Sequence, residues 1–512
     1  MDFYTIHNYK KLDKFFFKIL NSKFATWRTY CVSTLQFIKP HPEYFIKYKL
    51  FFYKSKIIFI ILFLQYFLTF FLRLLKWLIR KIEDDFLNVL NYTNNNFKKE
   101  QADIVIVTSL VNINTLSSRR NSNNDFIFGK IIKHLKRKYK VKIIYLNLTQ
   151  LNSKKVFNIL KKNKDIYILN KILSFKKEFE VFKNQLIELK NLIFNLSIKK
   201  LGFRNYILIL MNIFSFETRN NFRLTLQLKD ILREIKPSIV TLSYEGNCWE
   251  KSVFSICKNM QKSKCLSVGY QHAGVMNNQT IISHKYKNEF NPDFIITSGK
   301  INIRYFNRLF GKKIKKKIFE IGSNRYIEEK KNKTIKSIGN KFNNVLLIPE
   351  GTFEETEILF NLSIKLAKKY SNKTFILRTH PQININSFSK KFYFFEKYKK
   401  LRNLIFSSKS FEHDLSRSNV VIYRGSTGVV TAILKGLFPI YFSQKNENLN
   451  LDPIFILKKF RKHMYSMNEF ERIVNNLKPN EYSDAKDFCS NYFRPQKSSK
   501  TLNIFKQIMN FK

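Results

Sequence analysis

The sequence predicts an α/β protein with two Rossmann-like, doubly wound domains that face a cleft, preceded by an N-terminal helical, membrane-associated segment. Three observations predict this fold class. From residue 103 onward, short runs rich in Val and Ile alternate with stretches whose apolar residues recur at helical spacing. A Lys-rich stretch at 328–341 separates two such alternating sets. Residues 57–72 form an apolar run without charge.

These patterns divide the chain into five segments, and 512 residues are enough for two domains with a core each. The segments are an N-terminal helical region at 1–100 with an apolar anchor at 57–79, a first Rossmann-like domain at 101–327 with a helical insertion, a linker at 328–341, a second Rossmann-like domain at 342–470, and C-terminal helices at 471–512.

The composition narrows the class of partner and the compartment. The net charge is +55, but Lys is spread over the whole length with Asn, Ile and Phe, as in proteins from AT-rich genomes. No helix-turn-helix, zinc or RNA-recognition motif accompanies the charge, so we expect no nucleic-acid partner, whereas an anionic membrane surface fits. The five cysteines include no CxxC pair, which is typical of a reducing cytoplasm and indicates no zinc site.

The apolar run near the N-terminus predicts contact with a membrane. Its sixteen residues, IIFIILFLQYFLTFFL, would span roughly 24 Å as a helix, less than a hydrocarbon core of about 30 Å. An extension to residue 79 includes Arg73 and Lys76, and both flanks are basic, which disfavours a spanning helix. We expect an in-plane or re-entrant anchor and a cytoplasmic, inner-membrane-associated protein, with a buried core helix as the alternative for this run.

The first sheet is expected between residues 103 and 323. Its predicted strands are 103–107, 141–146, 238–242, 265–269, 294–297 and 318–323, with helices at 126–138, 251–261 and from about 302. The loop at 110–125 contains no GxGxxG, so a dinucleotide is not expected there. Residues 153–235 have apolar positions at helical spacing and indicate core-facing helices without chemistry.

The second sheet is expected from residue 345 onward. Its predicted strands are 345–348, 374–377, 403–406, 420–423 and 436–442, with helices at 355–369 and 429–434. Beyond residue 451 the pattern predicts helices that could cross back over the first domain.

A candidate phosphate-binding turn follows the strand at 420–423. Free backbone N–H groups and two hydroxyls fall where the next helix begins, and such a helix start attracts phosphate, although a capped helix is the ordinary alternative. The residues are Gly425, Ser426, Thr427 and Gly428. Arg378, His380 and Pro381 end another strand of the same sheet. Because ligands bind outside the carboxyl ends of parallel strands, we expect both groups in one site.

Candidate bases follow strands of the first sheet. Glu245 and Glu250 come after the strand at 238–242, and His272 follows the strand at 265–269, bracketed by Gly269 and Gly274. An unperturbed imidazole titrates near pH 7, so the sequence ranks His272 first and Glu245 second as the catalytic base. Glu250 begins a helix, where a carboxylate is favoured in any case.

Several of these motifs resemble a known family. RTHP at 378–381, DLSRSNVV at 414–421, Ser426-Thr427 and GLFP at 436–439 are similar to the carboxyl half of GT-B glycosyltransferases of bacterial surface polysaccharides. The His-Pro and Ser/Thr pairing resembles capsule Kdo-transferases, bacterial sialyltransferases and teichoic-acid polyol-phosphate transferases. YEGNCWE at 244–250 and GYQH at 269–272 resemble a family of surface carbohydrate biosynthesis proteins. The resemblance covers about 103–453.

The resemblance implies roles for individual residues. In those relatives the histidine of the His-Pro pair and the Ser/Thr turn hold the phosphates of the donor nucleotide, which implies that role for His380, Ser426 and Thr427. In the polyol-phosphate transferases a first-domain histidine is the base, which would suit His272. This chain has Thr431 before Ala432 where such enzymes often place a Glu that contacts the donor ribose. No DxD motif is present, so no metal and no cofactor are expected.

Three functions follow as hypotheses, two of them transferases and the third from another class. The first is a metal-independent glycosyltransferase that moves a sugar from a nucleotide-sugar donor, held by the second domain, to a cell-surface polysaccharide or lipid-linked glycan acceptor, held by the first. The second is a phosphotransferase of the teichoic-acid type with a CDP-polyol donor. The third is a non-catalytic protein that binds membrane surfaces or polyanions through its charge.

Overall fold

The computed structural model describes most of residues 100–511 and nine positions between 57 and 75. Within 100–511, the residues left out are 110–124, 147–164, 170–172, 195–212, 215, 246, 261–264, 275–289, 311–316, 327–343, 352, 381–382, 384–387, 390–399, 445–451, 458–459 and 478–481. The predicted linker at 328–341 and Pro381 therefore lie outside the described residues.

The first domain is built on a parallel sheet of seven strands in the order β3-β2-β1-β4-β5-β6-β7. The strands are β1 (Ile104–Ser109), β2 (Val141–Leu146), β3 (Ile166–Ile168), β4 (Ile239–Ser243), β5 (Leu266–Gln271), β6 (Phe294–Thr297) and β7 (Ile318–Glu320). In register, Ile104 pairs with Val141 on one side and with Ile239 on the other. The central strands are buried on both faces, which explains their nearly continuous apolar sequence.

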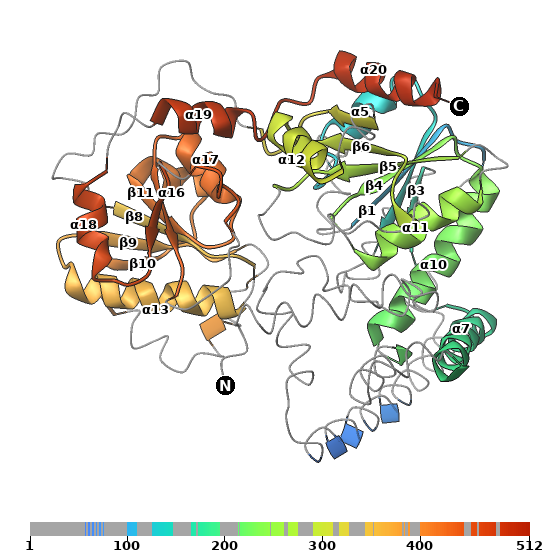
Figure 1. Ribbon diagram of the computed structural model, residues 1–512, viewed down its shortest axis with the longest axis horizontal. Helices are drawn as coiled ribbons and strands as arrows, with labels where there is room; N and C mark the ends of the chain where they lie inside the picture. The colour runs from blue at the N-terminus through green and yellow to red at the C-terminus, as the bar shows by residue number, and fades with distance from the viewer. Residues whose placement is uncertain are drawn as a thin grey trace.

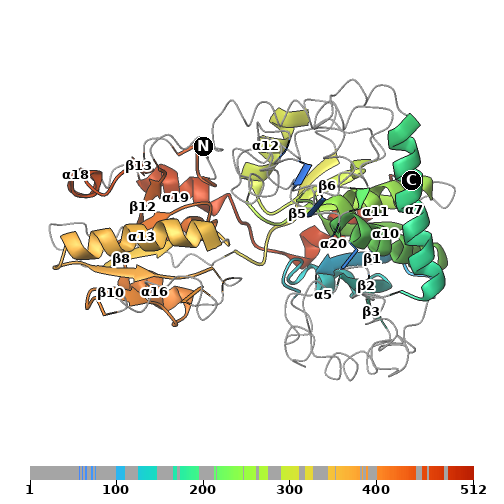
Figure 2. The same cartoon turned by 90° about the horizontal axis from the view of Figure 1, so that it is seen from below.

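Helices cover this sheet, as Figures 1 and 2 show. They are α5 (Ile131–Leu135), α7 (Phe175–Phe194), α10 (Phe216–Ile235), α11 (Cys248–Asn259) and α12 (Lys300–Phe310). α10 contacts both α11 and α7, so α7 forms an outer layer at the margin of the domain.

The second domain has a parallel sheet of six strands in the order β10-β9-β8-β11-β12-β13. The strands are β8 (Asn344–Ile348), β9 (Thr374–Leu377), β10 (Leu404–Phe406), β11 (Val420–Tyr423), β12 (Phe438–Phe442) and β13 (Lys462–Met464). Its helices are α13 (Phe353–Lys369), α16 (Phe411–Arg417), α17 (Gly428–Leu434), α18 (Glu469–Asn475) and α19 (Tyr482–Ser490).

Both sheets reverse their strand order at one point, between β1 and β4 in the first and between β8 and β11 in the second. In doubly wound sheets the crevice at such a switch point, outside the carboxyl ends of the strands, is where ligands bind. The two doubly wound parallel sheets confirm the predicted GT-B-like fold class. They also place the loop after β4 and the loop after β11 at the switch points.

Two edge strands correct the sequence interpretation. Residues 153–235 were expected to be helical and residues beyond 451 likewise, but β3 and β13 extend the two sheets there. Each has only three residues and is half-buried at its first two positions. A strand this short, at the edge of a sheet, has no room for the alternation that identifies longer strands.

The helix expected at 126–138 is also shorter than predicted. The buried Asp125 carboxylate accepts hydrogen bonds from the backbone N–H groups of Ile127 and Phe128, both at 2.8 Å. Gly129 follows with a φ of +54° and forms a bridge with Asp125. This side-chain turn competes with the helix over its first residues, so that α5 begins only at Ile131.

The chain returns from the second domain to the first. α20 (Ser498–Met509) packs against α5 and contributes Ile504, Phe505 and Ile508 to the core of the first domain (Figure 1). Residues 491–497, between α19 and α20, form the crossing segment. It is held by backbone hydrogen bonds from Arg494 N–H to the carbonyl of Ser298 and from Ser323 N–H to the carbonyl of Arg494. The two domains are therefore joined at the crossing segment as well as by the chain between β7 and β8.

The described positions between 57 and 75 are helical, and their apolar side chains are exposed, which does not fit the alternative of a buried core helix. Among the residues that the structure describes, no helix combines the length and the apolarity needed to cross a membrane.

Candidate functional site

The loop after β4 is fixed by one buried carboxylate. Glu250, in the first turn of α11, accepts hydrogen bonds from the Ser243 hydroxyl at 2.7 Å and from the backbone N–H groups of Glu245 and Asn247 at 3.0 and 2.9 Å. The Asn247 amide adds a fourth at 3.0 Å. Burial, followed by repulsion from Glu245, raises the pKa of Glu250 to about 7. Glu250 thus positions the loop rather than facing a substrate.

Two of the predicted residues meet at the carboxyl ends of β4 and β5. The Nε2 atom of His272 lies 3.4 Å from Oε1 of Glu245. The His272 side chain is 5% exposed and that of Glu245 is 24% exposed, so the carboxylate is the more accessible group of the pair. The other ring nitrogen of His272, Nδ1, is buried and has no hydrogen-bond partner among the described residues.

The ranking of His272 as the base assumed an unperturbed imidazole, and this premise is wrong. Burial, followed by the positive charge of Arg325, lowers the pKa of His272 to about 3. The pKa of Glu245 shifts in the opposite direction, because burial raises it by more than the charge of Arg325 lowers it. The structure therefore gives a weakly basic imidazole beside a carboxylate whose pKa is raised.

Arg325, which the sequence did not single out, occupies a turn after β7. Its backbone N–H bonds to the Ser323 hydroxyl at 3.1 Å, and the Tyr326 N–H bonds to the Ser323 carbonyl at 3.2 Å. Gly322 precedes the turn with a φ of +96°, and a Cβ there would lie 2.5 Å from the carbonyl oxygen of Pro495. Only glycine fits this close approach, so the crossing segment helps to set the place of Arg325.

The side chain of Arg325 joins the two domains. Its Nη1 atom donates a hydrogen bond of 2.9 Å to the hydroxyl of Thr427, in the turn after β11. Its charge also acts on Glu245 and His272 of the first domain and on His380 of the second. We call Glu245, His272, Arg325, His380 and Thr427 the interdomain site.

The turn after β11 has the geometry expected from the sequence. Gly425 adopts a φ of +62°, a backbone conformation that favours glycine, and a Cβ there would also displace the Glu350 side chain, whose Oε2 would lie 2.4 Å away. The Ser426 hydroxyl accepts a hydrogen bond of 3.3 Å from the N–H of Gly428, the first residue of α17. Thr427 occupies the N-cap position of this short helix in αR conformation without a side-chain capping bond, and its hydroxyl accepts the hydrogen bond from Arg325.

A buried ion pair anchors that turn. Arg424, immediately before Gly425, is 1% exposed and donates through Nε and Nη2 to the two carboxylate oxygens of Glu355, the second bond measuring 3.0 Å. Its Nη1 donates to the carbonyl of Phe442 at 3.1 Å. Arg424 thus ties β11 to α13 and β12 and holds the backbone on which Ser426 and Thr427 sit.

The residues after β9 divide between two environments. Arg378 Nη1 donates to the Asp414 carboxylate at 2.9 Å and to the carbonyl of Lys409 at 2.6 Å, and its guanidinium lies over the Phe411 ring. His380 is half-buried, and burial followed by the charge of Arg325 lowers its pKa. His380 is therefore coupled electrostatically to Arg325. Arg378, in contrast, is held by α16 and by the residues before that helix.

Sequence reasoning missed Arg325 because no motif surrounds it. The one available observation was that a basic residue follows the strand at 318–323 at the same edge as the candidate bases. Among the described residues, no group of three or more His, Cys, Asp or Glu side chains is placed to hold a metal ion.

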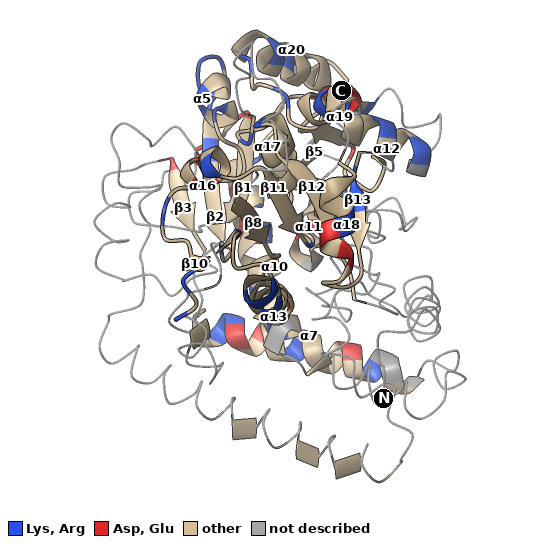
Figure 3. Ribbon diagram, turned by 90° about the vertical axis from the view of Figure 1, so that its left-hand side faces the viewer, with Lys and Arg blue, Asp and Glu red and all other residues tan. Residues whose placement is uncertain are grey.

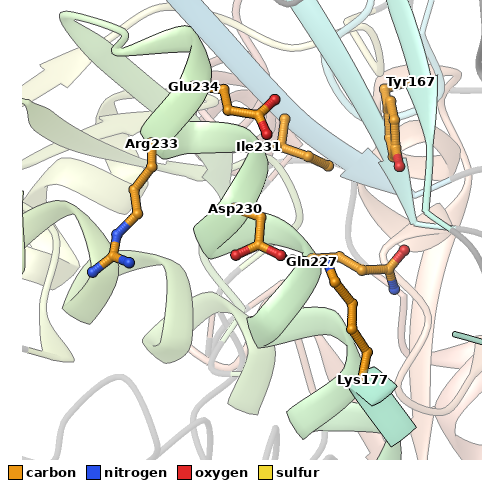
Figure 4. Close-up of a pocket in the computed structure, with 7 residues that line it drawn as sticks. All are labelled: Tyr167, Lys177, Gln227, Asp230, Ile231, Arg233 and Glu234. Carbon is orange, nitrogen blue, oxygen red and sulfur yellow. Dashed lines mark hydrogen bonds and ion pairs between the residues drawn. The ribbon is translucent and has the colours of Figure 1, made fainter. Parts of the chain in front are cut away.

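A separate cavity of about 330 Å³ lies between β3, α7 and α10 (Figure 4). Its lining carries both charges, including the ion pair of Lys177 with Asp230, and it contains no residue of the interdomain site. The lining residues are Tyr167, Lys177, Gln227, Asp230, Ile231, Arg233 and Glu234.

Comparisons with known proteins give likeness to solved structures alone. No protein-family model matches the chain, and no curated protein matches it. UDP-GlcNAc 2-epimerase from Neisseria meningitidis bound to UDP-GlcNAc is 12% identical with a TM-score of 0.45, over 80% of this chain and 99% of its own. The 2-epimerase from Methanocaldococcus jannaschii in complex with UDP-GlcNAc and UDP is 14% identical with a TM-score of 0.45, over 80% and 99%. MurG from Acinetobacter baumannii is 8% identical with a TM-score of 0.43, over 79% and 99%.

Proposed function

We propose that the protein is a glycosyltransferase that moves a sugar from a nucleotide-sugar donor to a cell-surface polysaccharide or lipid-linked glycan acceptor at the cytoplasmic face of a membrane. The observation that supports it is Arg325. This cation bonds to Thr427 in the turn after β11 and acts electrostatically on Glu245 and His380. A positive charge between a carboxylate base and a hydroxyl-bearing turn suits a reaction in which a phosphate leaves as a hydroxyl is deprotonated.

The proposed chemistry is one displacement. The acceptor hydroxyl gives its proton to Glu245 as its oxygen forms a bond to the anomeric carbon of the donor sugar. The bond from that carbon to the phosphate oxygen breaks, and its electron pair leaves with the nucleotide. Arg325, the Ser426 and Thr427 hydroxyls and neutral His380 stabilise the negative charge that develops on the phosphate.

Glu245 is the base in this proposal, and His272 positions it. The His272 Nδ1 atom is buried and Nε2 faces the carboxylate, so the imidazole can donate to Glu245 but offers no accessible basic nitrogen. The raised pKa of Glu245 brings it closer to neutral, where a general base works best.

Removal of Arg325 tests donor binding. We expect Arg325→Ala to weaken the binding of the preferred nucleotide among UDP, GDP, CMP and CDP by about tenfold to a hundredfold in isothermal titration, because a charge-assisted hydrogen bond contributes roughly 1.5–3 kcal/mol. Arg304→Ala, which removes an exposed arginine of α12, is the matched control and should leave affinity unchanged. Equal affinities in both variants would remove the donor phosphates from the interdomain site.

Incubation of the protein with each type of donor, with detection of the released nucleotide, separates the functional classes. Release of UDP, GDP or CMP from a nucleotide sugar would fit the proposal, whereas turnover with a CDP-polyol alone would favour the teichoic-acid type of phosphotransferase. If the protein shows no saturable nucleotide affinity and its binding to polyanions disappears at modest salt, the non-catalytic alternative is favoured.

The pH dependence follows from the shifted groups. A general base acts when deprotonated, so kcat/KM should fall as the pH decreases through the raised pKa of Glu245. His272, whose pKa is lowered to about 3, stays neutral across the neutral range and should contribute no limb near pH 6.5. The acid limb should therefore persist in His272→Asn. An acid limb near pH 6.5 that disappears in this variant would assign the titration to the imidazole.

A further inference from the structure

The outer helix of the first domain, α7, exposes most of a row of large apolar side chains to solvent. Along α7, the residues at positions 175, 179, 182, 186, 189 and 193 are Phe, Phe, Phe, Leu, Leu and Ile, at alternating spacings of four and three. Such spacing places all six on one stripe of a helix. Phe175 is 68% exposed, Phe179 is 64% exposed and Leu186 is 42% exposed, whereas residues 182 and 189 are half-buried, so one side of the stripe meets the domain and the rest is open to solvent.

The face of α7 that does pack on the domain is largely polar. Glu178 is buried and bonds to Arg223 of α10 at 2.7 and 2.9 Å and to Arg219 at 3.2 Å. The buried Gln185 amide donates to the carbonyl of Ile213 at 2.9 Å. These contacts fix how the helix is rotated, because turning the apolar stripe inward would break an ion pair buried on both sides.

A row of lysines borders the exposed stripe. Lys176, Lys183 and Lys190 are exposed and recur at seven-residue spacing, so they lie on one flank of the stripe. Glu180 is the one exposed acidic residue of the described part of α7. Figure 3 shows α7 at the margin of the molecule, with Lys or Arg positions along its length.

We propose that α7 lies on an anionic lipid bilayer, with its apolar stripe in the headgroup and acyl boundary and its lysines against the lipid phosphates. An apolar stripe bordered by lysines is the pattern of a helix that lies in a membrane interface. Each lysine near such a surface adds attraction, and the net charge of +55 adds long-range attraction. This docking surface rests on the membrane location of the proposed function and names the part of the chain that makes the contact, but it does not depend on which reaction the protein catalyses.

A second copy of the chain is a poorer occupant of the stripe. If a two-fold axis paired two α7 helices in antiparallel orientation, the same flank of each helix would lie side by side. The two lysine rows would then face each other and repel. Anionic lipid supplies the opposite charge along the whole row.

Quenching by brominated lipid tests the contact directly. The full chain with Phe179→Trp is bound to vesicles of equimolar phosphatidylcholine and phosphatidylglycerol, with and without bromine on the acyl chains, and the parent emission is subtracted. We expect the added emission to be lost with brominated lipid. The matched control, Phe126→Trp, alters an exposed aromatic residue near α5 and should keep its emission. Bound protein whose added emission at 179 persists would overturn the proposal, even if another segment holds the chain on the vesicle.

Binding strength gives a second readout. Lys176→Gln, Lys183→Gln and Lys190→Gln together should weaken binding to these vesicles by about tenfold to a hundredfold at low ionic strength. Removing the three exposed lysines Lys133, Lys138 and Lys365 is the control of equal charge and should have a smaller effect. Equal losses in both triple variants would show that net charge alone binds the surface. A change of oligomeric state in Phe179→Ser with Leu186→Ser, with vesicle binding unchanged, would assign the stripe to a second copy.

Discussion

Replacement of Glu245 by Gln should lower kcat by about 10²- to 10⁴-fold, the range that a general base contributes. The amide keeps the shape of the side chain beside His272 but cannot accept a proton from the acceptor. Donor affinity should remain near that of the parent, because the proposed phosphate ligands Arg325, Thr427 and His380 are unchanged. Steady-state kinetics together with nucleotide titration measure the two quantities separately.

The controls distinguish a lost base from a disturbed loop. Glu412→Gln removes the charge of a carboxylate that is 71% exposed in the second domain and should leave kcat unchanged. His272→Ala should lower kcat less than Glu245→Gln, since it removes a positioning contact. The opposite order, with turnover retained in Glu245→Gln and lost in His272→Ala, would return the role of base to the imidazole.

Replacement of Arg424 by Met should cost about 3–5 kcal/mol of unfolding free energy. The change removes both hydrogen bonds from the guanidinium to Glu355, a carboxylate that is 0% exposed, and leaves its charge in the core. Denaturant unfolding of the variant measures the loss. Because the residue precedes Gly425, nucleotide binding should weaken as well.

A second substitution identifies the cause. In Arg424→Met with Glu355→Leu, the buried charge is absent and most of the lost stability should return. Arg402→Met, at an exposed position of the same domain, should change stability by about 0.5 kcal/mol or less. If the double variant is no more stable than Arg424→Met, the loss comes from the missing bond to the Phe442 carbonyl rather than from a stranded charge.

The sequence predicted strands inside the two sheets, because burial on both faces demands continuous apolar residues. β2, β6, β9 and β11 begin and end at the expected residues. The edge strands β3 and β13 were missed, since each has only three residues, two of them half-buried, among lysines, and this leaves no periodicity. A turn set by the Asp125 side chain likewise shortened α5 without any change in apolar pattern.

The candidate site was predictable where it depends on local chemistry. The turn at Gly425 and the loops that carry Glu245 and His272 follow strands, and strand ends can be found from sequence. Arg325 also follows a strand, but its role could not be predicted in this way, because its contact with Thr427 joins residues 102 positions apart. The lowered pKa of His272 depends on burial and on that same arginine, so the order of the two candidate bases also required the fold.

The return of α20 to the first domain has a consequence for biosynthesis. Ile504, Phe505 and Ile508 belong to the same core as the strands β1 and β2, although the whole second domain is translated between them. On the ribosome, domains ordinarily fold in the order in which they emerge. Here the first sheet emerges early, but its core lacks the side chains of α20 until the last residues of the chain are made, so the first domain cannot complete its core before the second domain has been translated.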